Sequence, residues 1–291
     1  MQEQMKLNLM AGVASVSVAT TLVALKLWAL HQTGSLSIAA SLADSALDFL
    51  VSCGGLLAIY YAARPADEDH AFGHTSAEDL AALAQSLFIT GAAIAVGWQA
   101  VDRLLQDGPA PLADEVTGIR VMVISIVLTL ALVVWQRYVA ARTGNKVVAA
   151  DSLHYVGDLL PSMGAIVALW ASTRFGIGRI DSMVALVAAA IMALGAWKIG
   201  KGAWDALMDR AADPEVIDGI AEIARNWPGV HGYHDLKTRM AGSRIFVNLH
   251  IELDGTQTLR EAHDIGAALR RKILTTYPQT DVIIHKDVAR D

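Results

Sequence analysis

Four residues in two apolar stretches could together bind a metal cation. Asp44 and Asp48 are four residues apart in SLADSALDFL, and His154 and Asp158 have the same spacing in DSLHYVGDLL. Side chains at positions i and i+4 of a helix lie on one face. Three carboxylates and one imidazole provide four ligands, a set that suits tetrahedral Zn²⁺. The spacing therefore predicts two helices that converge on one divalent cation.

The apolar surroundings of these acids favour a cation as their partner. A charged side chain at the centre of a bilayer costs roughly 2.5–3.5 kcal/mol on insertion scales. The alternative is that the acids face a water-filled cavity or pair with basic residues, but no Lys or Arg lies in the middle of a predicted span. Asp151 lies one turn before His154 and closer to the helix start, so we expect it to cap that helix or contact solvent.

A second candidate group lies in the loop after the second apolar stretch. The segment PADEDHAFGH contains Asp67, His70 and His74, which are spaced so that a short loop could fold around a metal ion. Asp and His are both common zinc ligands, although a loop rich in these residues can also be simply polar. The loop is therefore a candidate second metal site.

The third candidate group lies in the C-terminal part of the chain. Its members are His234, His250, His263, His285 and Asp287. His285 and Asp287 share one face of a predicted strand, because side chains alternate along a strand with a period of two. Any one of these His residues could be an ordinary surface residue, but their number in so short a segment predicts a metal site.

The elements that position these groups are predicted from hydropathy. The chain has 291 residues, of which 54% are apolar and 18% charged, whereas a soluble domain usually carries about 25% charged residues. Its mean hydropathy is +0.41. A helix needs about 20 apolar residues to cross a bilayer, and six segments qualify: 9–30, 36–62, 80–105, 116–139, 147–172 and 179–200. We therefore predict a membrane α-helical protein with six transmembrane helices.

The distribution of basic residues predicts the orientation of the spans. The side that holds Lys6, Arg64 and the cluster around Arg142 carries more Lys and Arg than the side that holds Arg103. Because cytoplasmic loops are enriched in basic residues, both termini are expected in the cytoplasm. An even number of spans agrees with that orientation.

After Arg210 the pattern changes to that of a small soluble domain. Helical periodicity follows Asp213, a candidate N-cap before a proline, and two alternating segments then read as strands. A second amphipathic helix opens at Thr258, with Glu261 placed for a capping box, and DVIIHKD forms a last strand. The order α-β-β-α-β predicts a two-layer α+β domain. We place a transmembrane domain at residues 1–208 and a cytoplasmic metal-binding domain at 209–291.

Composition also excludes several classes of function. The net charge of −6 provides no basic surface for nucleic acid, and the one cysteine, Cys53, excludes an internal disulfide. An intramembrane metallohydrolase would also need buried metal ligands, but it would usually add a general base such as the Glu of HExxH, a motif that does not occur here. We therefore expect no enzymatic activity and no organic cofactor.

Together these features resemble the cation diffusion facilitator family, in particular its bacterial zinc and ferrous-iron efflux branch. The resemblance rests on DxxxD and HxxxD in the second and fifth spans, on PADEDHAFGH, and on ALMDRA before an α+β tail. It covers nearly the whole chain. It implies a homodimer in the bacterial inner membrane that exchanges a cytoplasmic divalent metal for protons, with a tail of metallochaperone-like fold.

The same resemblance assigns roles to the three groups of residues. The transport site matches Asp44, Asp48, His154 and Asp158, the loop site matches Asp67, His70 and His74, and the binuclear site of the tail matches His234, His250, His263, His285 and Asp287. The chain departs from its close relatives at Ser76, where they carry a Lys that forms an inter-subunit ion pair. Its expected acidic partner, Asp209, is present. We therefore expect the dimer to rely more on the third span and the tail.

The sequence thus predicts a proton-coupled antiporter that exports divalent cations across the bilayer. Zn²⁺ is the expected substrate, with Cd²⁺ and Fe²⁺ as alternatives, because an imidazole ligand disfavours Mg²⁺ and Ca²⁺, which prefer all-oxygen shells. Zn²⁺ is also expected as a structural or regulatory ion in the tail. The competing hypothesis is a membrane metal sensor or scaffold that does not transport.

Overall fold

A computed structural model describes residues 2–33, 36–105, 116–159 and 180–289 of the chain. The chain divides into two compact units. One unit consists of Gln2–Ala203 and the other contains the chain from Trp204 onward. The first unit is helical, and the second contains a three-stranded sheet.

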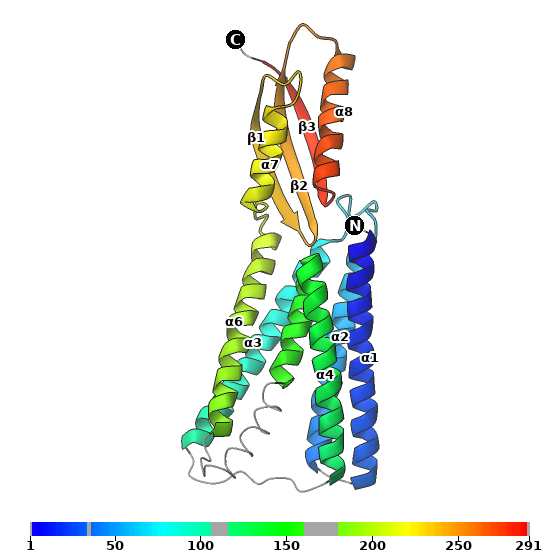
Figure 1. Cartoon of the computed structure of the whole chain (residues 1–291), viewed down its shortest axis with the longest axis vertical. Coiled ribbons are helices and arrows are strands. Elements are labelled where there is room, and N and C mark those ends of the chain that lie inside the picture. Colours follow the sequence, from blue (N-terminus) through cyan, green and yellow to red (C-terminus); the bar gives the residue numbers. More distant parts are fainter. Residues whose placement is uncertain (1, 34–35, 106–115, 160–179, 290–291) are drawn as a thin grey trace. The chain divides into compact units, whose positions relative to one another are not determined.

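The helical unit confirms the predicted membrane α-helical class. Its elements are α1 (Gln2–Thr33), α2 (Leu36–Ala62), α3 (Ser76–Leu105), α4 (Val116–Thr143), a helical segment at 146–159, and most of α6 (Ile180–Leu207). Within the described residues, five helices are long and apolar enough to cross a membrane. Of the fifth predicted span, 147–172, only the part up to residue 159 lies within the described residues. Helix α1 packs against both α2 and α4 (Figure 1).

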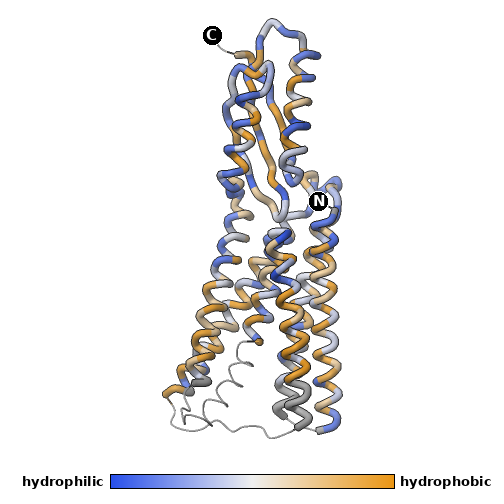
Figure 2. The backbone as a smooth tube through the Cα atoms, in the orientation of Figure 1, coloured by the Kyte–Doolittle hydropathy of each residue, from blue (hydrophilic) through white to orange (hydrophobic). Residues whose placement is uncertain are grey.

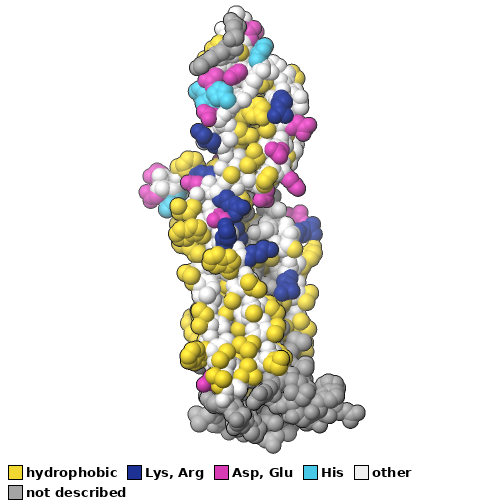
Figure 3. Space-filling model, turned by 90° about the vertical axis from the view of Figure 1, so that its left-hand side faces the viewer, with side chains coloured by type: hydrophobic (Ala, Val, Ile, Leu, Met, Phe, Trp, Pro, Cys, Tyr) yellow, Lys and Arg dark blue, Asp and Glu magenta, His cyan; other side chains and the backbone are white. Residues whose placement is uncertain are grey.

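The outer surface of the helical unit is apolar, as a lipid environment requires. Most residues of these helices are hydrophobic (Figure 2), and many hydrophobic side chains lie on the face seen in Figure 3. On α3, for example, Leu87, Ile94 and Trp98 are 66%, 67% and 77% exposed. The fully buried positions are often small, such as Ala11 and Ala82. Small residues let helices approach closely, which matters in lipid because apolar burial alone does not drive helices together there.

Polar contacts fix the segment that carries His154 to its neighbours. The Nζ atom of Lys146 donates to Asp79 Oδ1 at 2.7 Å and to the carbonyl oxygen of Gly202 at 3.1 Å. The Nδ2 atom of Asn145 donates to Glu78 Oε1 at 2.9 Å. The start of the 146–159 helix is thereby tied to α3 and α6, and this sets where the following turns of the helix lie.

The C-terminal unit has the predicted order α-β-β-α-β. It consists of α7 (Pro214–Arg225), β1 (Gly232–Ala241), β2 (Arg244–Leu253), α8 (Leu259–Thr276) and β3 (Thr280–Val288). The strands lie in the order β1-β2-β3, with β1 and β2 antiparallel and β2 and β3 parallel. Helix α7 contacts β1, α8 contacts β3, and the two helices contact each other, so both cover one face of the sheet (Figure 1).

The two faces of β2 explain this two-layer arrangement. Val247, Leu249 and Ile251 alternate along the strand and are fully buried in the core that the helices cover. Because alternate side chains point to opposite faces, Asn248 and His250 lie on the other face. The helices therefore bury the apolar face and leave the face with the histidines uncovered.

The two predicted helix starts differ in how they are capped. At α8, Thr258 and Glu261 form the predicted capping box: the Thr258 backbone N–H donates to Glu261 Oε2 at 2.7 Å, and the Glu261 N–H donates to Thr258 Oγ1 at 3.3 Å. At α7, Asp213 occupies the N-cap position, but its side chain makes no capping hydrogen bond to any described residue. Pro214 at the first helical position lacks an N–H and has φ preset for a helix.

A pair of substitutions in α8 tests which face of this helix holds the tail together. Leu269 is 0% exposed and Leu259 is 85% exposed. Leu269→Ala should destabilise the tail by about 2–5 kcal/mol, because it removes buried apolar volume, whereas Leu259→Ala should cost less than about 0.5 kcal/mol. Hydrogen exchange of the β2 amides in the full-length protein measures both effects. Equal protection in the two variants would contradict the assigned core.

Candidate metal centres

The structure brings three of the four residues predicted for the transport site into contact. His154 Nε2 lies 2.9 Å from Asp48 Oδ1 and 3.8 Å from Asp158 Oδ2. One ligand atom from each of these residues lies within 4.8 Å of the others. The His154 side chain is almost fully buried, and the ring of Phe88 on α3 packs against it edge-on at 5.6 Å. A cation between α2 and the 146–159 helix could therefore be held by two carboxylates and one imidazole.

Asp44, the fourth predicted ligand, lies outside this group. It is exposed and is located one helical turn before Asp48 on α2. Among the described residues, the cluster of possible ligands contains Asp48, His154 and Asp158 without Asp44. The i, i+4 spacing therefore placed Asp44 on the correct helix, but it did not bring that carboxylate into the group in this conformation.

A basic residue that the sequence analysis overlooked lies beside this site. Lys26 is on α1, within the first predicted span, and its Nζ atom donates to Ser45 Oγ at 2.6 Å. The ammonium group interacts electrostatically with Asp44, Asp48 and Asp158. Lys26 lies near the end of the first predicted span and not in its middle, so the search for basic residues in the middle of the spans did not find it. The one Lys in the apolar part of the first span was the signal that could have revealed it.

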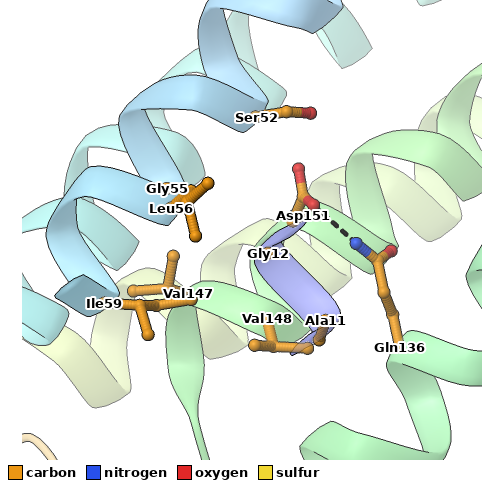
Figure 4. A pocket seen from close by; sticks show the side chains of 10 residues that line it. All are labelled: Ala11, Gly12, Ser52, Gly55, Leu56, Ile59, Gln136, Val147, Val148 and Asp151. Carbon is orange, nitrogen blue, oxygen red and sulfur yellow. Dashed lines mark hydrogen bonds between the residues drawn. The ribbon is translucent and has the colours of Figure 1, made fainter. Parts of the chain in front are cut away.

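Asp151 is not the capping or solvent-exposed residue that its position predicted. It is only 5% exposed, and its Oδ2 atom accepts hydrogen bonds from Ser15 Oγ and Gln136 Nε2, each at 2.5 Å. Figure 4 shows Asp151 at a small cavity between helices, with its carboxylate near Gln136 and directed toward Ser52. The cavity of about 10 Å³ is close to the space that one water needs.

The three predicted loop residues lie together between α2 and α3. His70 Nδ1 and His74 Nε2 are each 3.2 Å from a different oxygen of Asp67. The His70 and His74 rings lie 4.6 Å apart, and Gly73 adopts a φ of 85° that turns the chain between them. The Nδ1 atom of buried His74 has no hydrogen-bond partner among the described residues. The three side chains could thus hold one cation at the end of the helical unit.

The loop also prepares the carboxylate of Asp67 for a cation. The backbone N–H of His70 donates to Asp67 Oδ1 at 2.7 Å, and this hydrogen bond is the main cause that lowers the pKa of the Asp67 carboxyl. A lowered pKa keeps this carboxyl ionised at neutral pH, as a metal ligand must be.

The tail places three histidines in one row across the sheet. His234 on β1 pairs with His250 on β2, which in turn pairs with His285 on β3. Neighbouring rings in the row lie 5.0 Å and 4.6 Å apart. The strand register therefore sets the spacing of the three imidazoles on the face of the sheet opposite the helices.

The carboxylate of Asp287 lies at the centre of this row. It is 2.9 Å from His250 Nδ1 and 3.3 Å from the Nε2 atoms of both His234 and His285. The hydrogen bond from His250 is the main cause that lowers the pKa of the Asp287 carboxyl, and the neighbouring imidazoles add to it. Asp287 is therefore ionised at neutral pH. Among the described residues, His234, His250 and Asp287 form a cluster of possible ligands that suits Zn²⁺. His285 contacts Asp287 but lies outside that cluster.

His263, the remaining residue predicted for the tail site, is not part of this cluster within one chain. It lies exposed on α8, and α8 covers the face formed by Val247, Leu249 and Ile251. The histidine row lies on the other face of the sheet. The sequence pattern could not reveal this separation, because it does not show which face α8 covers.

Asp209, the acid expected to form an inter-subunit ion pair, has a partner in its own chain. Arg239 Nη1 donates to Asp209 Oδ1 at 3.2 Å. Asp209 adopts a φ of 58°, a left-handed conformation that Asp tolerates better than most residues. This ion pair connects the turn after α6 with β1.

Comparison with known proteins identifies both units. Residues 12–208 match the family model of the cation efflux transmembrane domain, and residues 212–288 match that of the cytoplasmic domain of cation efflux proteins. The two models together cover nearly all of the chain, and each covers one of the two units.

Full-length relatives match along almost the entire chain. The cation-efflux pump FieF of Cronobacter sakazakii is 40% identical over 95% of this chain and 91% of that protein. FieF of Pectobacterium carotovorum is 41% identical over 97% of this chain and 93% of that protein. Among solved structures, the metal-bound C-terminal domain of the CzcD transporter from Thermotoga maritima is 28% identical, with a TM-score of 0.25, over 25% of this chain and 87% of that one.

Removal of the central carboxylate should weaken metal binding by the tail. We expect Asp287→Asn to lower the zinc affinity of the histidine row by at least about tenfold, as the loss of even an outer-shell partner costs 10–100-fold. Asp281→Asn changes the same strand outside the cluster and should leave the affinity unchanged. Zinc titration of the two full-length variants measures this difference, and equal affinities would remove Asp287 from the site.

The pH dependence of the tail site follows from its ligands. Metal binding requires neutral imidazoles, so protons compete with zinc for these ligands and zinc affinity in the same titration should fall as the pH is lowered. Because the pKa of Asp287 is lowered in the folded tail, its ionised carboxylate stabilises the fold above the usual carboxyl pKa of about 3.9. This stabilisation is lost as the pH falls through the lowered pKa.

Proposed function

Because the chain belongs to the cation efflux family, also called the cation diffusion facilitators, we propose that it exports Zn²⁺ across a bacterial inner membrane in exchange for protons. The observation that carries this proposal is the contact of Asp48, His154 and Asp158 between two helices of the apolar unit. Such intramembrane ionisable residues commonly mark the pathway of an ion. The ligand chemistry favours Zn²⁺, with Cd²⁺ and Fe²⁺ as further substrates.

Proton exchange follows from the protonation states that the metal requires. A bound cation needs ionised carboxylates and a neutral imidazole, so metal and protons compete for Asp48, His154 and Asp158. The metal would bind from the cytoplasm, and protons from the other side would displace it after the helices rearrange. Sites near the middle of the bilayer commonly work in this alternating manner.

Asp44 is proposed as the fourth ligand of the transported ion. It lies one turn from Asp48 on α2, so the two carboxylates are on neighbouring turns of one helix face. A dication at Asp48 and His154 would attract this fourth side chain, which now lies outside the group. The rotation of α2 that brings Asp44 closer would be part of the transport cycle.

The other two clusters are proposed to hold Zn²⁺ that is not transported. In the loop, Asp67, His70 and His74 would bind an ion at the end of α2 and α3. In the tail, the histidine row and Asp287 would bind Zn²⁺ and stiffen the sheet, and His263 remains a predicted ligand that one chain does not bring to the row.

We also propose a homodimer with both termini in the cytoplasm. The family resemblance and the excess of Lys and Arg on one side of the spans support this orientation. The tail would contribute to the contact between the two copies, and zinc on its sheet would favour one dimer arrangement. Because Asp209 is already paired with Arg239, the dimer would not depend on a clamp at Ser76.

Flux through reconstituted vesicles tests the transport site. Purified protein in liposomes with a pH gradient and an internal zinc dye should take up Zn²⁺, and Asp48→Ala should reduce the rate at least about a hundredfold, because it removes a ligand needed in every cycle. Asp102→Ala removes an exposed acid of α3 outside the three clusters and should transport normally. Uptake that survives Asp48→Ala would overturn the site, and no uptake by the unaltered protein would favour a sensor that does not transport.

A substitution in the loop separates an accessory role from an obligatory one. We expect His70→Ala to reduce the initial rate of zinc uptake several-fold while transport persists, because the loop site lies outside the buried cluster of His154. Asp69→Ala, at an exposed neighbouring acid outside the cluster, should leave the rate unchanged. Complete loss of uptake in His70→Ala would instead make the loop a necessary step in the path of the metal.

A further inference from the structure

Lys26 places a positive charge within the helical unit, beside the proposed transport site. Its Nζ atom donates to Ser45 Oγ at 2.6 Å and to the carbonyl oxygen of Ser41 at 3.1 Å. Both acceptors belong to α2, and Ser45 is only 1% exposed. The side chain therefore crosses from α1 to α2, and its ammonium group ends at a buried hydroxyl.

This direction differs from the usual behaviour of a lysine in a membrane helix. Such lysines generally extend along the helix so that the charged end reaches the polar interface. Lys26 instead donates two hydrogen bonds to α2, at Ser41 and Ser45, which lie on either side of Asp44 in the sequence. These hydrogen bonds to protein atoms hold the charge against α2, close in sequence to Asp44.

Three carboxylates interact electrostatically with this charge. The Lys26 ammonium interacts with Asp48, Asp44 and Asp158, which are the three acidic ligands of the proposed site. The hydrogen bonds of the ammonium group go to Ser41 and Ser45, which are not proposed ligands. The charge is therefore close enough to act on the site but is anchored beside it.

We propose that Lys26 is a tethered counter-cation that competes electrostatically with the transported metal. This inference rests on the proposed function of Asp44, Asp48, His154 and Asp158. Without metal, the ammonium partly neutralises the carboxylates and lowers the cost of keeping them charged in an apolar unit. When a dication binds, the ammonium repels it, so the site holds the metal less tightly than its ligands alone would.

Weaker binding benefits a transporter, because the ion must leave as well as bind. A site with three carboxylates and an imidazole that held Zn²⁺ at full strength would release it slowly. Repulsion from Lys26 acts on the bound dication in each cycle and favours its release. Lys26 is thus a residue that sets the balance between affinity and turnover without ligating the metal.

Two substitutions of Lys26 separate this role from a structural one. Lys26→Met removes the charge and keeps much of the side-chain volume, whereas Lys26→Arg keeps the charge. Loss of one unit charge near a bound dication should tighten zinc binding about tenfold, so Lys26→Met should lower both KM and the maximal rate of zinc uptake in liposomes. Lys26→Arg should restore both toward their original values. Lys6→Met, at an exposed lysine of the same helix, should change neither.

The outcomes distinguish failure of this inference from failure of the proposed function. If the unaltered protein takes up no zinc, the transport proposal itself fails. If it takes up zinc and Lys26→Met has an unchanged or higher KM, Lys26 is not a counter-cation. A purely structural role would lower the thermal stability of Lys26→Met in detergent and reduce the rate without lowering KM, and this result would also overturn the inference.

Discussion

The structure of the helical unit depends on the contact between His154 and Asp48. His154 is nearly fully buried and Asp48 is mostly so, and groups of this kind are costly to remove from water unless they are paired. The contact joins α2 to the 146–159 helix across 106 positions of sequence. The same two side chains are proposed ligands of a cation. A bound metal would therefore replace the contact between His154 and Asp48 that stabilises this part of the bundle without metal.

Buried polar side chains extend from this contact along the 146–159 helix. Asp151 accepts hydrogen bonds from α1 and α4, and Lys146 pairs with Asp79 on α3. These side chains lie about one to two turns apart on one helix and bind it to four others, α1, α3, α4 and α6. In an apolar environment each such hydrogen bond has no water to compete with it, so a few of them can fix which helices are neighbours. The polar residues thus determine the arrangement, and the small apolar residues allow close packing.

The spacing of residues in the sequence predicted which side chains share a face of one helix or strand. It did not predict which side chains from different helices and strands come into contact. The i, i+4 pairs, the capping box at Thr258 and the shared strand face of His285 and Asp287 are local, and all follow from helix or strand geometry. That His263 lies on the other side of the sheet depends on the face that α8 covers. The partners of Lys26 and Asp151 depend on the rotation of α1 and α4 about their axes. These tertiary contacts join residues more than a dozen positions apart. Sequence periodicity does not predict such contacts.

The proposed transport site and the proposed tail site share Asp and His ligands but differ in their surroundings, and this difference supports their different proposed roles. Asp287 and its three histidines lie partly exposed on a rigid sheet face, where strand register fixes the distances between the ligands. A cation there can exchange with solvent without moving a helix. His154 is buried between helices, and Asp44 is one turn out of reach, so a cation there must be bound and released by helix movement. A fixed surface site would suit the metal proposed to stay in the tail, whereas a site between helices, beside Lys26, would suit the metal proposed to pass through.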